Sequence, residues 1–191
     1  WDEWARAHTS SEFYDVDGFV AGAGTLREVE LRELGDVEGR SLLHLQCHIG
    51  LDTIDWARRG ARVTGLDFSE PAVEAARAIA ARCEVDARFV HANVYDAHEA
   101  AGGDFDVVFT SYGALPWLPD LPAWASVVAN CLKPGGTFYV VEFHPLIGML
   151  GDDGTFAYPY FRGNDPIVES TDGSYASGDA GPGTSYEWPY S

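Results

Sequence analysis

Two polar elements follow two apolar runs in the first half of the chain. The apolar residues Leu42 to Leu45 precede a turn at residues 46–50 that ends in Gly50, and the run Val63 to Leu66 precedes Asp67. Backbone N–H groups of a glycine-bearing turn bind polar ligands, and a carboxylate accepts hydrogen bonds from both vicinal hydroxyls of a ribose. The spacing therefore predicts a nucleoside-type ligand held between the turn and Asp67.

A β–α–β unit brings these two elements together. Residues 51–57 carry apolar side chains at helical spacing, and Gly60 ends this predicted helix before a strand at 62–66. The strand at 42–45 then runs parallel to the second strand through a right-handed crossover, with the ligand beyond the carboxyl ends of both. The predicted fold is an α/β, Rossmann-like three-layer sandwich with a mainly parallel sheet.

The side chains of the turn narrow the choice of nucleotide. Dinucleotide sites need glycines so that the backbone can approach the pyrophosphate, but Gln46 and His48 stand where two of those glycines would fall. Both side chains would crowd a diphosphate. A cofactor with a ribose and no phosphate fits better, and S-adenosylmethionine is one.

Five segments extend this pattern along the chain in a fixed order. They are the turn at 44–50, Asp67-Phe68-Ser69, the segment 89–96, the segment 105–115 and the turn 132–137. From about Tyr14 to Pro145 the chain resembles the class I S-adenosylmethionine-dependent methyltransferases of the small-molecule type. Its motif at the first turn is atypical, because His44 replaces the usual acid and Gln46 and His48 replace two glycines.

The resemblance implies S-adenosyl-L-methionine as the cofactor and assigns a role to each matching position. Asp67 and the adjacent Phe68 would hold the ribose. Asn93, Val94 and Tyr95 would lie by the adenine. The methionine moiety would lie by the remaining matching positions, which are His44, Gln46, His48, Gly50 and Ser111. An N-terminal tyrosine often covers the crevice in this family, which makes Tyr14 a candidate; packing of the N-terminal aromatic residues on the sheet edge is the alternative.

Methyl transfer needs positioned partners and, for some acceptors, a general base. His144 follows the predicted fifth strand, 138–143, and is the candidate catalytic residue; the alternative is that it caps the strand. Glu142 lies on the same face of that strand and can orient His144 or bind the cofactor, with a solvated carboxylate as the alternative. His44, Cys47 and His48 are metal-ligand types, but their spacing is not that of a zinc site, so no metal is predicted.

Composition excludes several partners. The net charge of −18, from 12 basic and 30 acidic residues, argues against nucleic acid and anionic membranes. No apolar run is long enough to span a bilayer, and three scattered cysteines favour a reducing cytoplasm. We expect a cytoplasmic enzyme acting on a small, neutral or cationic organic molecule. The alternative is a binding or regulatory domain that has the nucleotide fold without turnover; a nicotinamide oxidoreductase is a weaker one.

The remaining patterns divide the chain into three parts. We expect an N-terminal helical cap at 1–40, the cofactor-binding core at 41–147, and an irregular aromatic lid or antiparallel excursion at 148–191. Further helices are predicted at 25–34, 72–83 and 123–132, and further strands at 87–91 and 105–110. The last two strands of the usual seven-stranded sheet have no counterpart here.

The predicted fifth strand then forms an edge of the sheet. It is apolar at Phe138, Val140, Val141 and Phe143, and exposed apolar edges tend to pair with other chains. We therefore expect that the 191 residues are a fragment of a longer polypeptide, or that the tail or a partner subunit covers this edge. A homo-oligomer formed through this strand or the C-terminal segment would be one such case.

Overall fold

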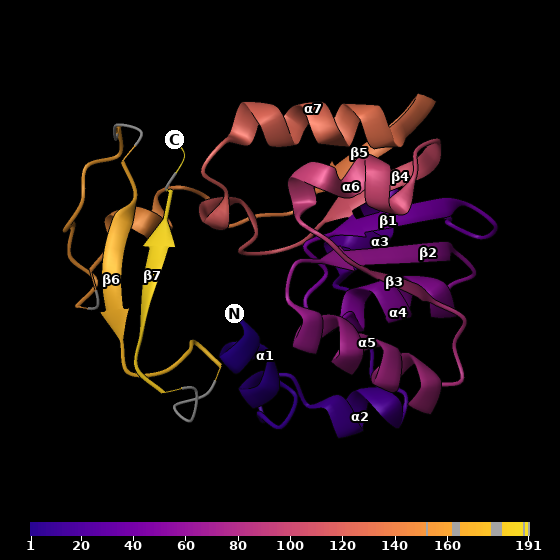
Figure 1. Ribbon diagram of the computed structural model, residues 1–191, viewed down its shortest axis with the longest axis horizontal. Helices are drawn as coiled ribbons and strands as arrows, with labels where there is room; N and C mark the ends of the chain where they lie inside the picture. The colour runs from indigo at the N-terminus through magenta and orange to yellow at the C-terminus, as the bar shows by residue number, and fades with distance from the viewer. Residues whose placement is uncertain (152, 162–164, 177–180, 189, 191) are drawn as a thin grey trace.

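A computed structural model describes residues 1–151, 153–161, 165–176, 181–188 and 190. Its centre is a five-stranded parallel sheet in the order β3-β2-β1-β4-β5, flanked by helices (Figure 1). The strands are β1 (Ser41–Leu45), β2 (Arg62–Asp67), β3 (Arg88–His91), β4 (Phe105–Thr110) and β5 (Leu132–Val140). The predicted α/β architecture is confirmed, and the β1–β2 pair is parallel from Ser41↔Arg62 to Leu45↔Leu66.

Helices cover both faces of the sheet. The chain forms α1 (Asp2–His8), α2 (Val16–Val20), α3 (Glu28–Leu34), α4 (Leu51–Arg58), α5 (Glu70–Arg82), α6 (Ala97–Ala101) and α7 (Leu121–Cys131), with single turns η1 (Val94–Asp96), η2 (Leu115–Trp117) and η3 (Ile147–Met149). Leu42 packs on the face that α3 and α4 cover, whereas Leu43 and Leu45 pack with α6 and α7. These leucines are fully buried, which is why β1 reads as a continuous apolar run.

Local signals fix where the main helices begin. The Ser69 hydroxyl accepts a hydrogen bond from the backbone N–H of Ala72 at the start of α5, and the Asp120 carboxylate accepts one from Ala123 at the start of α7. Each helix has a proline within its first two positions, where no intrahelical N–H partner is lost. The residues Ser69-Glu70-Pro71 already predicted the start of α5, whereas α7 starts two residues before the predicted range 123–132.

The fifth strand begins earlier and ends earlier than the predicted range 138–143. Leu132 already pairs with Phe105, and regular pairing resumes at Thr137 opposite Val107. Residues 133–136 lie between these two points, and Gly135 has a left-handed φ of 80°. The predicted turn is thus an irregularity inside β5. Among the described residues β5 pairs only with β4, so it is the predicted edge strand.

The C-terminal segment contains more regular structure than predicted. β6 (Ile167–Thr171) and β7 (Gly183–Glu187) form an antiparallel pair from Ile167↔Glu187 to Thr171↔Gly183, in a sheet of their own. This pair stands apart from the central sheet, with α1 between them (Figure 1). Of the two forms considered for 148–191, the antiparallel excursion is therefore present. None of the helices in the described ranges has the length and apolar character needed to cross a membrane.

Candidate cofactor and substrate site

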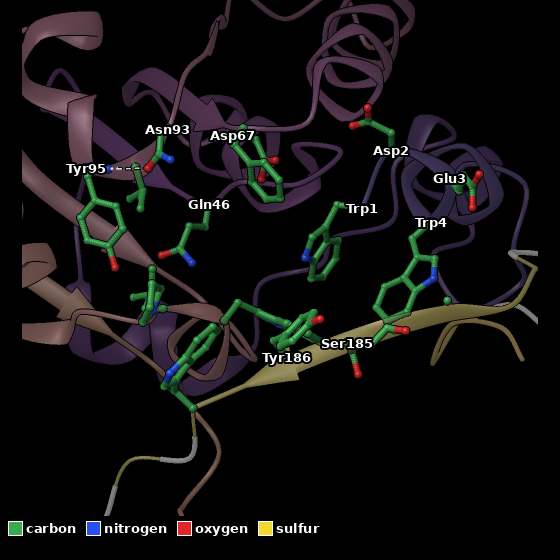
Figure 2. A pocket seen from close by; sticks show the side chains of 18 of the residues that line it. Trp1, Asp2, Glu3, Trp4, Gln46, Asp67, Asn93, Tyr95, Ser185 and Tyr186 are labelled. Carbon is green, nitrogen blue, oxygen red and sulfur yellow. Dashed lines mark hydrogen bonds between the residues drawn. The ribbon is translucent and has the colours of Figure 1, made fainter. Parts of the chain in front are cut away.

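A cavity of about 750 Å³ opens at the carboxyl ends of the parallel strands (Figure 2). Its inner wall comes from the sheet and contains six of the predicted site residues: Gln46, Asp67, Phe68, Asn93, Val94 and Tyr95. Its outer wall comes from α1 and β7 and contains residues 1–4 and 183–186 together with Trp188. Trp117 and its two following residues line the cavity between these walls. The cavity therefore lies where a β–α–β unit binds its ligand.

Asp67 is fixed in place by main-chain groups. It ends β2, is 7% exposed, and accepts hydrogen bonds from the backbone N–H groups of His48 at 2.8 Å and Ser69 at 2.9 Å. Burial raises the pKa of this carboxyl group, while the backbone hydrogen bonds act in the opposite direction. Each carboxylate oxygen still has a lone pair for a further donor. Asp67 thus links the turn to the cavity and can still accept hydrogen bonds from a ligand.

The turn has the backbone of a glycine-rich loop although it contains one glycine. Gln46, His48 and Gly50 have φ values of 58°, 50° and 78°. All three are left-handed, a conformation that costs a residue with a side chain roughly 1–2 kcal/mol. Gln46 and His48 therefore adopt the left-handed conformation that glycine would adopt at lower cost. The surrounding packing offsets the strain of this backbone conformation.

Gly50 has no room for a side chain. A Cβ atom at this position would lie 2.7 Å from the Phe89 ring and 2.8 Å from the Cβ of Ala76. Gly50 also caps the N-terminus of α4. It is buried behind the turn rather than in the cavity wall, so its role is to let α4 approach the sheet closely.

Gln46 extends from the turn into the cavity (Figure 2). Its Nε2 donates a hydrogen bond to the carbonyl oxygen of Ala114 at 3.0 Å, which joins the turn to the loop after β4. Its Oε1 is buried and has no hydrogen-bond partner among the described residues. A buried amide oxygen without a partner costs about 1–3 kcal/mol, so this atom is suited to accept a hydrogen bond from a ligand.

His44 lies beneath the turn, outside the cavity wall. Its Nδ1 and the hydroxyl of Thr53 are 2.8 Å apart, and its Nε2 is 3.3 Å from the hydroxyl of Ser111. Burial lowers the pKa of His44 to about 4, so the ring is neutral at pH 7. The structure therefore brings the predicted residues His44 and Ser111 together, but neither lines the cavity.

His48 belongs to a partly buried hydrogen-bonded group that joins three distant segments. Its Nε2 lies 2.8 Å from Nδ1 of His8, whose Nε2 lies 2.8 Å from the hydroxyl of Ser174. The hydroxyl groups of Tyr14 and Tyr175 are 2.5 Å apart, and the Tyr14 ring packs on both histidines. Tyr14 and His48 thus hold α1 and the C-terminal segment against the turn, and their side chains do not line the cavity.

Burial lowers the pKa of both histidines in this group. The value falls to about 4 for His8 and to about 3 for His48, where the adjacent His8 adds to the effect. The pair is therefore neutral at pH 7, with one ring nitrogen donating and the other accepting. This network depends on both rings staying uncharged.

The adenine region predicted at 93–95 is a short ordered turn. The Asn93 side chain accepts a hydrogen bond from the backbone N–H of Tyr95 at 3.1 Å, as Figure 2 shows. The Tyr95 hydroxyl donates to the carbonyl oxygen of Asp120 at 3.2 Å and accepts from its N–H at 3.1 Å. Tyr95 thus ties η1 to the start of α7, and all three predicted residues face the cavity.

Glu142 has a structural role that the sequence did not indicate. Its carboxylate accepts hydrogen bonds from three consecutive backbone N–H groups, at 2.6 Å from Gly113, 2.9 Å from Ala114 and 3.0 Å from Leu115. The hydrogen bonds described for this carboxylate do not include His144, it does not line the cavity, and it is held by the loop rather than by solvent, so the structure supports none of the three predicted roles. Glu142 instead fixes the loop whose Ala114 carbonyl oxygen accepts from Gln46.

His144 lies on the surface after β5. Its side chain is exposed, and its Nδ1 accepts a hydrogen bond from the backbone N–H of Leu146 at 3.2 Å. It does not line the cavity. This geometry matches the alternative of a turn-forming residue, and the catalytic role of His144 stays a prediction.

The outer wall includes residues that the motifs did not indicate. Trp1, Trp4, Tyr186 and Trp188 line the cavity, and Trp117 is within 6.0 Å of both N-terminal tryptophans, measured between ring centroids. Their aromatic enrichment was visible in the sequence. Their convergence was not, because α1 and β7 lie at opposite ends of the chain and share no periodic pattern.

The residue types that suggested a metal do not converge. His44 and His48 are engaged with separate partners, and burial raises the pKa of the Cys47 thiol well above its usual range. In the part of the chain that the structure describes, no group of three or more His, Cys, Asp or Glu side chains could hold a metal ion.

The sheet order and the flanking helices define a Rossmann-like α/β domain with a cavity at the strand ends, and comparison with known proteins gives its family. A family model described as "Methyltransferase domain" matches residues 43–138, half of the chain. The chain belongs to this family. The match runs from β1 into β5 and includes every element of the inner wall.

Individual proteins agree with this assignment. A ubiquinone biosynthesis O-methyltransferase of Alkalilimnicola ehrlichii is 37% identical over 54% of this chain and 41% of its own length. One of Nitrosococcus oceani is 32% identical over 60% of this chain and 48% of its own length. The chain thus spans less than half the length of these curated relatives.

A solved S-adenosylmethionine-dependent methyltransferase of Mesorhizobium loti has a similar structure. The two are 28% identical and superpose with a TM-score of 0.53, over 69% of this chain and 58% of that one. The likeness supports the Rossmann-like methyltransferase fold described above.

Proposed function

We propose that this chain binds S-adenosyl-L-methionine in the cavity at the strand ends and transfers its methyl group to a small organic molecule. The observation that carries the proposal is the buried Asp67 carboxylate at the end of β2, held by the backbone of the turn and facing the cavity. The family match and the solved methyltransferase of Mesorhizobium loti support the same chemistry.

The residues present fit this cofactor. Asp67 can accept both ribose hydroxyls, and Asn93 to Tyr95 form the adjacent surface for the adenine. The unpartnered Oε1 of Gln46 can accept a hydrogen bond from the ammonium group of the cofactor's amino-acid end. Of the two turn side chains, only Gln46 enters the cavity, where it occupies the position of a glycine that a pyrophosphate site needs, so NAD is the less suitable ligand.

The bound cofactor would supply an activated methyl group on a positively charged sulfur. The chain's own residues then need to hold the acceptor in line and exclude water. The aromatic outer wall, with Trp1, Trp4 and Tyr186, suits this purpose because it covers the cavity with apolar surface. The predicted proton-accepting role of His144 would require an acceptor that loses its proton outside the cavity, because His144 does not line it.

The wider assignments extend the proposal. We divide the chain into an N-terminal cap at 1–40, the cofactor-binding core at 41–147 and a lid at 148–191, whose hairpin lines the cavity. The net charge of −18 argues against a nucleic-acid substrate and is compatible with the cytoplasm. The apolar edge strand β5 is the surface through which we expect any homo-oligomer to form.

Calorimetry with S-adenosylhomocysteine and NAD tests the cofactor assignment. We expect S-adenosylhomocysteine to bind and NAD not to bind. Asp67→Asn should lower the affinity for S-adenosylhomocysteine by roughly one to two decades, because a charge-assisted hydrogen bond contributes about 1.5–3 kcal/mol. The exposed Asp96→Asn is the matched control and should bind like the parent.

Equal affinity of the Asp67→Asn variant and the parent would refute the ribose assignment. Binding of NAD in place of S-adenosylhomocysteine would refute the cofactor class. Turnover on a compound panel with radiolabelled methyl donor then separates an enzyme from a binding domain, since only the enzyme transfers the label.

A further inference from the structure

A second cavity of about 420 Å³ adjoins the cofactor cavity. Trp4, Trp117 and Ser185 line both of them. Because the two cavities share these side chains, a molecule in the second cavity lies beside a molecule in the first. This arrangement suits a methyl acceptor.

Two aromatic rings of the second cavity stand nearly at right angles to a third, that of Trp4. The Trp4 ring makes angles of 84° with Trp117 and 87° with Tyr175, and the centroid distances are 6.0 Å and 6.2 Å. Aromatic rings grouped in this way form cages that bind alkylammonium groups through the negative faces of the rings. The rings therefore favour a compact cation over an anion.

The charged side chains of this cavity all have one sign. Glu169, Asp172 and Glu187 line it, and its described lining includes no lysine, arginine or histidine. Glu169 pairs across the hairpin with Ser185, two residues from Glu187, so both glutamates lie on the same face of β6 and β7. Like charges this close repel each other unless a cation lies between them.

The protein provides little compensation for these charges. Glu169 accepts a weak hydrogen bond from the Tyr158 hydroxyl at 3.4 Å, and none of the ion pairs among the described residues includes a carboxylate of this cavity. Glu187 is half-buried, and burial together with Glu169 raises its pKa. A bound ammonium group would relieve both effects at once.

We propose that the second cavity binds the ammonium group of an amine, which is the methyl acceptor of this protein. This inference rests on the proposed function and names its substrate class. The rings of Trp4, Trp117 and Tyr175 surround the cation, and the carboxylates of Glu169 and Glu187 balance its charge. Phenolate or carboxylate acceptors are disfavoured by the same charges.

Methyl transfer to such an amine conserves both charge and protons. The ammonium gives one proton to Glu187, the more buried carboxylate, and becomes a neutral amine. Its nitrogen lone pair forms the new N–C bond while the C–S bond breaks, and that electron pair stays on sulfur. The positive charge thus moves from sulfur to nitrogen, toward the aromatic rings and Glu169.

Binding of choline and of its neutral isostere, 3,3-dimethylbutan-1-ol, tests the cage without any methyl donor. Both are titrated into the parent protein by calorimetry and by tryptophan fluorescence. We expect saturable choline binding at least about tenfold tighter than binding of the isostere, because cation–π contacts of about 0.5–1 kcal/mol with each of three rings add to the attraction of the carboxylates. Equal binding of the two compounds, or no binding of choline, would overturn the proposal.

Matched variants locate the site. Tyr175→Leu and Glu187→Gln should each weaken choline binding by about tenfold, whereas Tyr175→Phe retains the ring and should bind choline like the parent. Glu74→Gln, an exposed site on α5, is the charge control. Cooperative thermal unfolding of each variant verifies folding, and Tyr175→Leu and Glu187→Gln variants that bind like the parent would contradict the site.

The binding experiments test the aromatic cage of Trp4, Trp117 and Tyr175 and the cofactor site independently. Choline binding without S-adenosylhomocysteine binding would support the cage and refute the proposed function. S-adenosylhomocysteine binding without choline binding would support the proposed function and refute the cage.

Discussion

The two walls of the cofactor cavity are built in different ways. Main-chain hydrogen bonds fix the inner wall, where Asp67 accepts from the backbone of His48 and Ser69 at the end of the buried strand β2. Side-chain contacts between distant segments fix the outer wall. The His8 to Ser174 contact joins residues 166 positions apart, and the Tyr14 to Tyr175 contact joins residues 161 positions apart.

The inner wall is therefore a consequence of the fold, whereas the outer wall depends on contacts between individual side chains. The inner wall follows from β1, the turn and β2, so it persists in any chain that forms this β–α–β unit. The outer wall depends on a few rings and two histidines that must remain uncharged. Changes to the inner wall should therefore affect the stability of the whole domain, and changes to the outer wall should affect closure and acceptor binding.

We expect the largest effect on stability from a substitution in the inner wall. Gly50→Ala places a Cβ atom 2.7 Å from the Phe89 ring at a φ of 78°, so overpacking and backbone strain add to each other. We expect the free energy of unfolding to fall by about 2–4 kcal/mol, measured by urea denaturation.

Gly39→Ala is the matched control for this change. Gly39 is exposed and has a φ of 70°, and a Cβ atom there would meet nothing within 4 Å. It should cost only about 1 kcal/mol, from the backbone conformation alone. Equal losses for the two variants would mean that close packing at Gly50 is not what the turn requires.

We expect a smaller loss of stability when acid pH protonates the histidines that hold the outer wall. The pKa of His8 is about 4 in the folded protein and 6.5 in the unfolded chain, so the unfolded chain binds more protons below pH 6.5. Stability supplied by neutral His8 is complete above pH 6.5 and decreases toward pH 4. This group alone should lower the free energy of unfolding by about 2 kcal/mol between pH 7.5 and pH 5.

His8→Gln isolates this contribution. Buried His48 and His44 shift in the same direction and remain in the variant, so its stability should still decrease toward acid pH, but less steeply than that of the parent. His98→Gln, an exposed site on α6, should retain the full dependence. Parallel pH profiles for the parent and His8→Gln would rule out the neutral histidine pair as a support of the wall.

The smallest expected effect lies outside both walls. His144 is exposed and accepts from the backbone N–H of Leu146, so His144→Gln should leave methyl transfer within about a factor of two of the parent and alter only the local turn. The measurement is kcat on whichever acceptor the compound panel identifies. A loss of about 10²-fold or more, typical of a missing general base, would instead establish the predicted catalytic role.

The contrast between the walls also explains how far the sequence could predict this protein. Alternating elements and the buried run at β1 were enough to predict the parallel sheet, and strand ends were enough to bring Gln46 and Asp67 to one cavity. Residues 93–95 were assigned to the same site by the family resemblance. Asp67 in particular followed from its place after the run Val63 to Leu66.

Other residues were placed differently because local pattern does not describe long-range packing. His44 matched a motif position but lies under the turn with Thr53, since inward side chains of β1 meet α4. Glu142 was predicted to orient His144, to bind the cofactor or to be solvated, yet it accepts from three backbone N–H groups of a loop 27 to 29 positions away. The side chain contacts that close the outer wall connect the two ends of the chain, where no periodicity relates them.

The most direct test of the central claim is a crystal structure of this protein with S-adenosylhomocysteine. We predict the ribose hydroxyls within hydrogen-bonding distance of the Asp67 carboxylate, about 2.5–3.0 Å, with the adenine against Asn93 to Tyr95 and the amino-acid end near Gln46. A ligand bound elsewhere, or one whose ribose makes no contact with Asp67, would contradict the account.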